Sequence, residues 1–199
     1  LGEQATKMKA LEQAADAANC ASLEAGTSWA TAKASIDACV ALCTADKGDM
    51  ILAAPGHIET ISAAGSLDLD VAGITVWGLG QGEKQATLNF TATAGTVDVD
   101  ARDVVLYGLR FKCSIDSLVI GLDIDFDDCT VDHCLFMESS TTTNALIWID
   151  VAGSTDNTCD NTTIRDCRFE NQAAGATHAI SITNVHDRLT IQGCVIEGD

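Results

Sequence analysis

A short apolar pattern recurs five times in this chain of 199 residues. Each copy places an apolar residue, two variable residues, a second apolar residue, one variable residue and a third apolar residue in a row, and the first copy lacks the last position. The copies begin 25 to 33 residues apart, and because this interval drifts, we expect loops of variable length between stacked units. The copies begin at Val76, Leu106, Val131, Ile164 and Ile191.

A second recurring pattern precedes the first and moves with it. Segments such as Leu67–Val71 and Leu122–Phe126 alternate apolar with polar residues, which is the period of a strand with one buried face. The intervals from Asp70 to Asp100 and from Asp100 to Asp125 equal the matching intervals of the first pattern. The chain therefore runs through one similar coil per repeat.

The strand must bend inside each copy of the first pattern, because the apolar positions change parity there. The bend falls on Gly, Asp or His, which are residue types that tolerate a positive φ. Hairpin signals such as Asn-Gly or Asp-Gly are missing, which argues against an antiparallel sandwich. The sequence therefore predicts an all-β solenoid, specifically a right-handed single-stranded parallel β-helix with an N-terminal capping α-helix. The predicted bend residues are Gly78, Gly108, His133, Asp166 and Gly193.

Stacked coils place like positions in interior columns. One predicted column contains Phe111, Phe136, Phe169 and Ile196, and the other contains Leu79, Leu109, Cys134, Cys167 and Cys194. The column cysteines are interpreted as thiols that fill space, and so are Cys39 and Cys43 nearer the N-terminus. The chain has nine cysteines, an odd number, and we expect it to be assembled in a reducing compartment such as a bacterial cytosol.

Three regions are predicted along the chain. Residues 1–27 form a loose helical attachment segment, and residues 28–47 form an amphipathic helix, capped by Ser28, that covers the first coil. Residues 48–199 form the β-helix. Because a core strand lies directly before the last residue, we expect the β-helix to continue further or to be covered by a neighbouring subunit.

Two stretches resemble a known group of proteins. Residues 29–38 followed by residues 48–59, which read Gly-Asp-Met-Ile-Leu-Ala-Ala-Pro-Gly-His-Ile-Glu, resemble the opening of pectate-lyase-like right-handed β-helix proteins. Residues 71–80 are similar to the next coil of many β-helix proteins encoded by tailed bacteriophages. The resemblance covers about residues 28–199 and implies the fold, since the same scaffold serves lyases, hydrolases, tailspikes and inert virion proteins.

The net charge and the lengths of the apolar runs exclude two kinds of partner. Lys and Arg number 11 against 29 Asp and Glu, a net charge of −18, so the basic surface that nucleic acid requires is missing. No apolar run approaches the roughly 20 residues of a membrane-spanning helix. We therefore expect neither nucleic acid nor a membrane as a partner.

Aspartates occupy the outward positions of the second pattern, and three interpretations remain open. The first is a solvated acidic face that keeps the protein soluble. The second is calcium held between coils by carboxylate oxygens, with no other cofactor expected. The third is a polysaccharide-cleaving cleft. The two expected columns are Asp68, Asp98 and Asp123, and Asp70, Asp100, Asp125 and Asp150; the calcium set is Asp70, Asp100, Asp125 and Asp150, and the catalytic set is Asp98, Asp100, Asp123 and Asp125.

The remaining polar residues suggest no catalytic constellation. No Ser or Cys lies in a recognisable nucleophile setting such as Gly-x-Ser-x-Gly. Arg102, Arg110 and Arg168 give no convincing base for a lyase. The four histidines are interpreted as surface or turn residues; they are His57, His133, His178 and His186.

Together with the resemblance, these features lead us to expect a non-enzymatic bacteriophage virion protein, as a head decoration, fibre or spike component. Its expected partners are other virion proteins, bound through residues 1–27, and further copies of itself, since the resemblance to phage spikes implies a trimer. It would be assembled in the host bacterial cytoplasm. One alternative is a receptor-degrading tailspike or a polysaccharide lyase or hydrolase acting on host surface polysaccharide. Another is a glycan-binding adhesion module.

Overall fold

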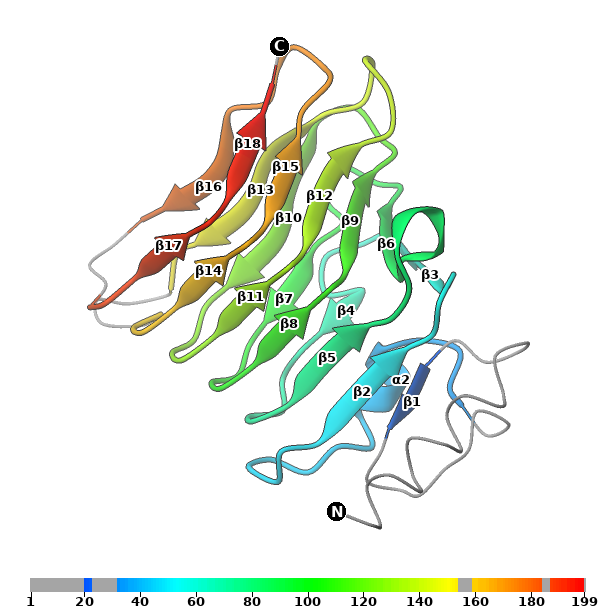
Figure 1. Ribbon diagram of the computed structural model, residues 1–199, viewed down its shortest axis with the longest axis vertical. Coiled ribbons are helices and arrows are strands. Elements are labelled where there is room, and N and C mark those ends of the chain that lie inside the picture. Colours follow the sequence, from blue (N-terminus) through cyan, green and yellow to red (C-terminus); the bar gives the residue numbers. More distant parts are fainter. Residues whose placement is uncertain (1–19, 23–31, 154–158, 184–186, 199) are drawn as a thin grey trace.

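The structure, a computed structural model, describes residues 20–22, 32–153, 159–183 and 187–198. Strands from successive coils form three sheets around one core (Figure 1). All strand pairs are parallel except β1 with β2, which is antiparallel. The fold is therefore a parallel β-solenoid, as the sequence predicts.

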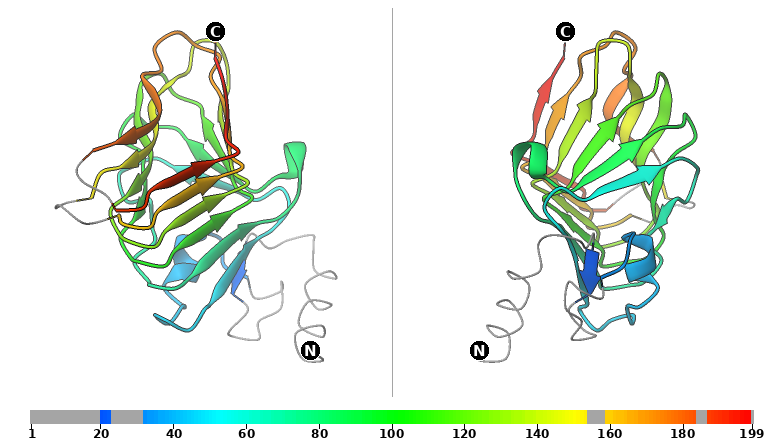
Figure 2. Two further views of the ribbon diagram at one scale, coloured as in Figure 1. Left: turned by 60° about the vertical axis from the view of Figure 1, so that its left-hand side comes forward. Right: turned by 90° about the vertical axis from the view of Figure 1, so that its right-hand side faces the viewer.

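The three sheets run along the length of the solenoid, so that the coils lie on top of one another (Figure 2). A short 3-10 helix, η2 (Gly82–Lys84), follows β5. Sheet A contains β1 (Cys20–Ser22), β2 (Met50–Ala53), β5 (Thr75–Gly78), β8 (Val105–Tyr107), β11 (Thr130–Asp132), β14 (Thr163–Arg165) and β17 (Thr190–Gln192). Sheet B contains β3 (Ile58–Ile61), β6 (Thr87–Phe90), β9 (Arg110–Cys113), β12 (Leu135–Glu138), β15 (Arg168–Glu170) and β18 (Val195–Glu197). Sheet C contains β4 (Leu67–Asp68), β7 (Val97–Val99), β10 (Leu118–Ile124), β13 (Ala145–Val151) and β16 (His178–Ile182).

The first sequence pattern forms an interior column of sheet A. Val76, Leu106, Val131 and Ile164 pair in register from strand to strand, and the column continues to Ile191. The first four side chains are buried, whereas Ile191 on the last strand is exposed. Residues 25 to 33 positions apart therefore lie side by side, and the repeat interval is the length of one coil.

The phenylalanine column of sheet B is confirmed. Phe111, Phe136 and Phe169 pair in register, and all three rings are fully buried. The centroid of the Phe136 ring lies 4.5 Å from that of Phe111 and 4.7 Å from that of Phe169, with the planes nearly parallel. Stacked rings of this kind add about 0.5–1.5 kcal/mol per pair to the energy of area burial.

The cysteine column consists of thiols. Cys134, Cys167 and Cys194 form no disulfide, and the first two are buried. A hydrogen bond with Cys134 and burial raise the pKa of the Cys167 thiol, so it stays protonated and packs as a small apolar group. Cys39 differs from the prediction because it is disulfide-bonded as well as buried.

Four of the five predicted bend residues have a positive φ. The values are 67° for Gly108, 52° for His133, 51° for Asp166 and 66° for Gly193. Gly78 lacks a positive φ and has a different role, because a Cβ there would lie 2.6 Å from the carbonyl oxygen of Gly108. Gly78 therefore allows two coils to approach closely.

The N-terminal helix is much shorter than predicted. In the described part of residues 28–47, the α-helix is only α2 (Asp37–Val40). The carboxylate of Glu59 accepts a hydrogen bond from the backbone N–H of Ile36, 2.8 Å away, and so fixes the chain just before the helix. After the helix, the backbone N–H groups of Leu42 and Cys43 donate to the carbonyl groups three residues before them, so the chain continues as tighter turns.

Within the predicted helical segment 1–27, residues 20–22 form β1, a strand that pairs with β2; the rest lies outside the described residues. A short helix with little apolar surface is marginally stable by itself, so pairing with β2 prevails over the weak helical pattern. No helix in the described part of the chain is long and apolar enough to cross a membrane.

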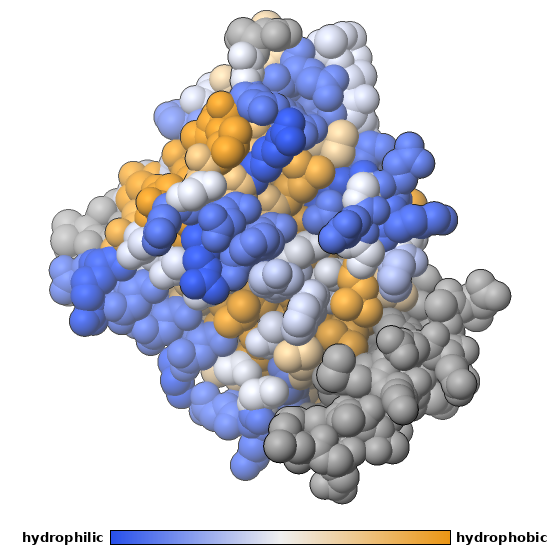
Figure 3. All heavy atoms as spheres, viewed as in Figure 1, coloured by the Kyte–Doolittle hydropathy of each residue, from blue (hydrophilic) through white to orange (hydrophobic). Residues whose placement is uncertain are grey.

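Apolar side chains are exposed where the last described strands lie. Ile182, Ile191, Val195 and Ile196, from β16, β17 and β18, are each about half exposed. Hydrophobic residues are visible at the corresponding upper part of the molecule in Figure 3. The three sheets end here with strands that pair on one side only.

We expect Phe136→Ala to lower the free energy of unfolding by about 3–5 kcal/mol, because it leaves a ring-sized cavity between two stacked phenylalanines. Urea unfolding measures the change. The matched control is Phe126→Ala, since Phe126 is exposed and should change stability by no more than about 0.5 kcal/mol. Equal losses in the two variants would contradict the predicted interior column.

Candidate functional site

An acidic row runs along the outer face of sheet C. Asp68, Asp98, Asp123 and Asp150 pair in register across β4, β7, β10 and β13, and Ser181 follows on β16. The prediction that placed Asp150 in the column of Asp125 is wrong. Ile124 pairs with Val151, so the register places Asp150 beside Asp123.

The row is only partly solvated. The Oδ1 atoms of Asp68, Asp123 and Asp150 are buried and lack a hydrogen-bond partner. Burial, followed by repulsion from Asp125 and Asp150, raises the pKa of Asp123 to about 7. Burial also raises the pKa of Asp68, with repulsion from its acidic neighbours adding to the effect. The acidic face therefore contains a carboxyl that exchanges its proton near neutral pH.

The other acidic column runs beside this row. Burial and the neighbouring aspartates raise the pKa of Asp100 and of Asp125. The predicted calcium set is therefore split, because Asp70, Asp100 and Asp125 share one column and Asp150 lies in the other. The predicted catalytic set is brought onto two neighbouring coils, and it comprises Asp98, Asp100, Asp123 and Asp125.

A different kind of surface lies on the outer face of sheet A. Trp77, Tyr107, Asp132, Arg165 and Gln192 follow one another in register across five strands. The Trp77 and Tyr107 rings meet edge to face, with centroids 5.1 Å apart, and 39% of Trp77 is exposed. The sequence reasoning missed this row. The signal was present, because Trp77 and Tyr107 occupy the same position in consecutive copies of the first pattern.

Asp132 is the buried centre of the polar half of this row. Its Oδ2 accepts two hydrogen bonds from Arg165, 2.9 Å from Nε and 2.6 Å from Nη2. Its Oδ1 lies 2.5 Å from Nδ1 of His133. Burial alone would raise the pKa of Asp132, but the hydrogen bonds from Arg165 and His133 outweigh it and hold the pKa below its usual range.

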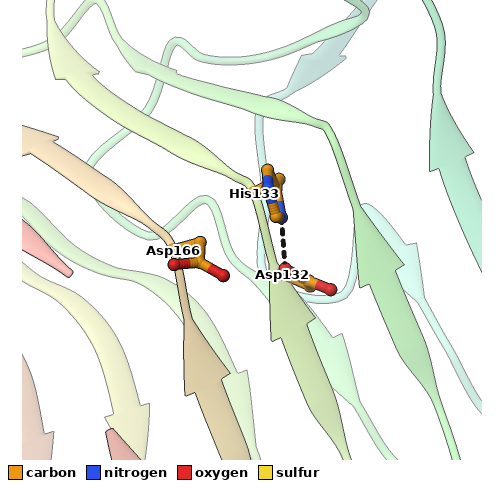
Figure 4. A group of neighbouring side chains, drawn as sticks. All are labelled: Asp132, His133 and Asp166. Carbon is orange, nitrogen blue, oxygen red and sulfur yellow. Dashed lines mark hydrogen bonds and ion pairs between the residues drawn. The ribbon is translucent and has the colours of Figure 1, made fainter. Parts of the chain in front are cut away.

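His133 and Asp166 meet Asp132 at the bend between sheets A and B. Figure 4 shows the three side chains, which come from two adjacent strands of the solenoid. The atoms that could bind a metal lie within 4.8 Å of one another. The His133 ring also packs against Tyr107, with centroids 5.3 Å apart, so the cluster adjoins the aromatic row.

The three arginines considered in the sequence analysis lie outside this cluster. Arg102 pairs with Asp46 and Asp103, and Arg168 pairs with Glu170 and Glu197. Arg110 donates to the Thr87 hydroxyl, so each of these arginines has a structural partner.

His57 closes a turn, as predicted, because its backbone N–H donates to the carbonyl of Ala54, 3.0 Å away, but it does not lie at the surface. Its side chain is buried and pairs with Glu59, 3.1 Å away, which in turn holds the Ile36 amide. His133 and His178 are exposed as predicted, and His186 lies outside the described residues.

No family model, no curated protein and no solved structure matches this chain. The arguments for function therefore rest on the sequence itself and on the geometry of the solenoid, its interior columns and its outer faces.

Asp123→Asn tests the acidic row. The folded pKa of about 7 lies above the unfolded value of about 3.9, so the folded state holds a proton that the unfolded state lacks across this window. The contribution of Asp123 to the stability of the wild-type protein is therefore lost as the pH rises from about 4 to 7. We expect the variant to be more stable than wild type at pH 8 by about 1–2 kcal/mol, after a discount for partial exposure, and equal to it near pH 4.

Thermal unfolding followed at pH 4, 6 and 8 measures this difference. Asp116→Asn is the control, since Asp116 is exposed and lies outside the row. A variant that gains nothing at pH 8, or that gains equally at every pH, would show that Asp123 is an ordinary solvated carboxylate.

Proposed function

We propose that this chain is a non-enzymatic structural protein of a bacteriophage virion, a head decoration, fibre or spike component whose right-handed β-helix forms a rigid projection. The observation that carries the proposal is the unbroken register of interior columns from β2 to β17 in sheet A and from β3 to β18 in sheet B. A projection must transmit force along its length, and hydrogen bonds between successive coils run in that direction. Stacked interior rings resist bending of the coils.

The virion assignment draws on the sequence. Residues 71–80 are similar to a coil of β-helix proteins from tailed bacteriophages, and residues 48–59 resemble the strand that opens such folds. In this proposal residues 1–27 bind other virion proteins and copies of the chain form an oligomer. The net charge of −18 keeps neighbouring projections from associating along their sides.

The proposal is tested on purified phage particles. Peptides from residues 48–198 should be recovered by mass spectrometry after gradient purification, and antibodies against the chain should label a projection in electron micrographs. Recovery of the chain only in the soluble fraction of the host lysate would overturn the virion assignment.

A second candidate function is a glycan-binding adhesion module, favoured by the outward row of Trp77 and Tyr107. Aromatic rings offer flat apolar surfaces that pack against sugar rings, and buried polar groups beside them fix orientation. Arg165 and Gln192 continue the same row and can donate to hydroxyl groups. The strand spacing places one side chain of the row on each of five successive coils, with Asp132 between the two rings and the two donors.

We expect Trp77→Ala to weaken binding to host surface polysaccharide at least tenfold, about 1.4 kcal/mol, because the most exposed ring of the row is lost. Biolayer interferometry on immobilised polysaccharide measures the change, with Phe126→Ala as an exposed aromatic control. Equal binding by both variants would remove the second candidate. Release of new reducing or unsaturated ends that Asp100→Asn abolishes would instead establish the polysaccharide-cleaving alternative.

A further inference from the structure

We propose that Asp132, His133 and Asp166 form a binding site for one divalent first-row transition-metal ion, of which Zn²⁺ is the representative. This site is independent of the proposed virion function and of glycan binding. It lies at the outer bend between β11 and β12 and reaches the neighbouring coil between β14 and β15.

The backbone brings the three ligands together. His133 and Asp166 are the bend residues of adjacent coils, and both adopt a left-handed conformation with φ near 50°. Equivalent backbone conformations on stacked strands direct successive side chains to the same side of the solenoid. The potential ligand atoms of the three residues consequently lie within 4.8 Å of one another (Figure 4). An ion bound among them would cross-link two coils.

Asp132 is held in place for this role. Arg165 binds only its Oδ2, through two nitrogens, and leaves Oδ1 facing His133. An ion bound to Oδ1 and Nδ1 would break the hydrogen bond between them, release its proton to solvent and require the two atoms to move apart from their 2.5 Å separation. Arg165 is a positioning residue, because it orients a ligand without contacting the ion.

Space for the third ligand is left by the next coil. A Cβ at position 193 would lie 2.2 Å from Oδ1 of Asp166, so the Asp166 carboxylate occupies space that is free only because residue 193 is a glycine. The site also opens to solvent, since 54% of the His133 side chain is exposed. An ion can therefore enter without unfolding of the solenoid.

The donor set selects the class of ion. Imidazole nitrogen and carboxylate oxygen are both donor types that zinc accepts, and the three residues equal the number of protein ligands in an open zinc site, whose fourth position is taken by water. Calcium requires six to eight oxygens, which three side chains do not supply. The acidic row of sheet C offers oxygen atoms alone, so the nitrogen donor distinguishes the two faces.

The test uses the full chain and titrates ZnCl₂ by calorimetry. Wild type should bind about one ion, and His133→Asn and Asp166→Asn should each weaken binding at least tenfold. Asn tolerates the left-handed backbone at both positions, so the variants keep the bend. His178→Asn is the control, since His178 is an exposed histidine of sheet C.

Cobalt supplies the second readout. The Co²⁺ spectrum of wild type should show nitrogen and oxygen ligation without a thiolate charge-transfer band, and His133→Asn should abolish the bound-ion bands. A thiolate band would assign the ion to cysteines and overturn the proposal. Zinc binding that His133→Asn leaves unchanged, or that His178→Asn removes, would overturn it as well.

Discussion

The structure depends on one constraint, which is that every interior side chain must pack against the equivalent side chain of the coils above and below. Parallel strands lie about 4.8 Å apart, so a column must accept its own residue type repeatedly. Phe111, Phe136 and Phe169 meet this constraint with nearly parallel rings, and Val76, Leu106 and Val131 meet it with branched side chains. The bends and outer faces follow from columns that are fixed in this way.

The same register that builds the core also builds rows on the outside. On sheet C it aligns Asp68, Asp98, Asp123 and Asp150, and there burial, followed by repulsion from neighbouring aspartates, raises the pKa of Asp68 and of Asp123. On sheet A it aligns rings and then opposite charges, so that Asp132 gains a partner in Arg165 from the next coil. A solenoid thus repeats whatever chemistry its sequence places on an outward position. Such a row destabilises the fold where neighbouring coils carry like charges, and stabilises it where they carry opposite charges.

The coils could be predicted because their signals are local and repeated. Leu106, Val131 and Ile164 occupy one position of a pattern that the chain itself displays. The register of Asp150 was missed because β13 is seven residues long and contains one aspartate, so the sequence did not show which of the two aspartate columns Asp150 joins. In the described part of residues 28–47 the helix is short and begins where Glu59, a residue from β3, binds the Ile36 amide, a contact that no local pattern predicts. The Asp132–Arg165 pair joins residues of different coils, so no pattern within one coil predicts it.

The central claim is that residues one coil apart lie in register inside a single solenoid. Methyl-labelled protein in solution tests it most directly, through nuclear Overhauser effects among the side chains of Leu106, Val131 and Ile164. The account predicts strong Leu106–Val131 and Val131–Ile164 cross-peaks and a much weaker Leu106–Ile164 cross-peak. Absence of both neighbouring cross-peaks, with these methyl groups instead close to unrelated parts of the chain, would contradict the claim.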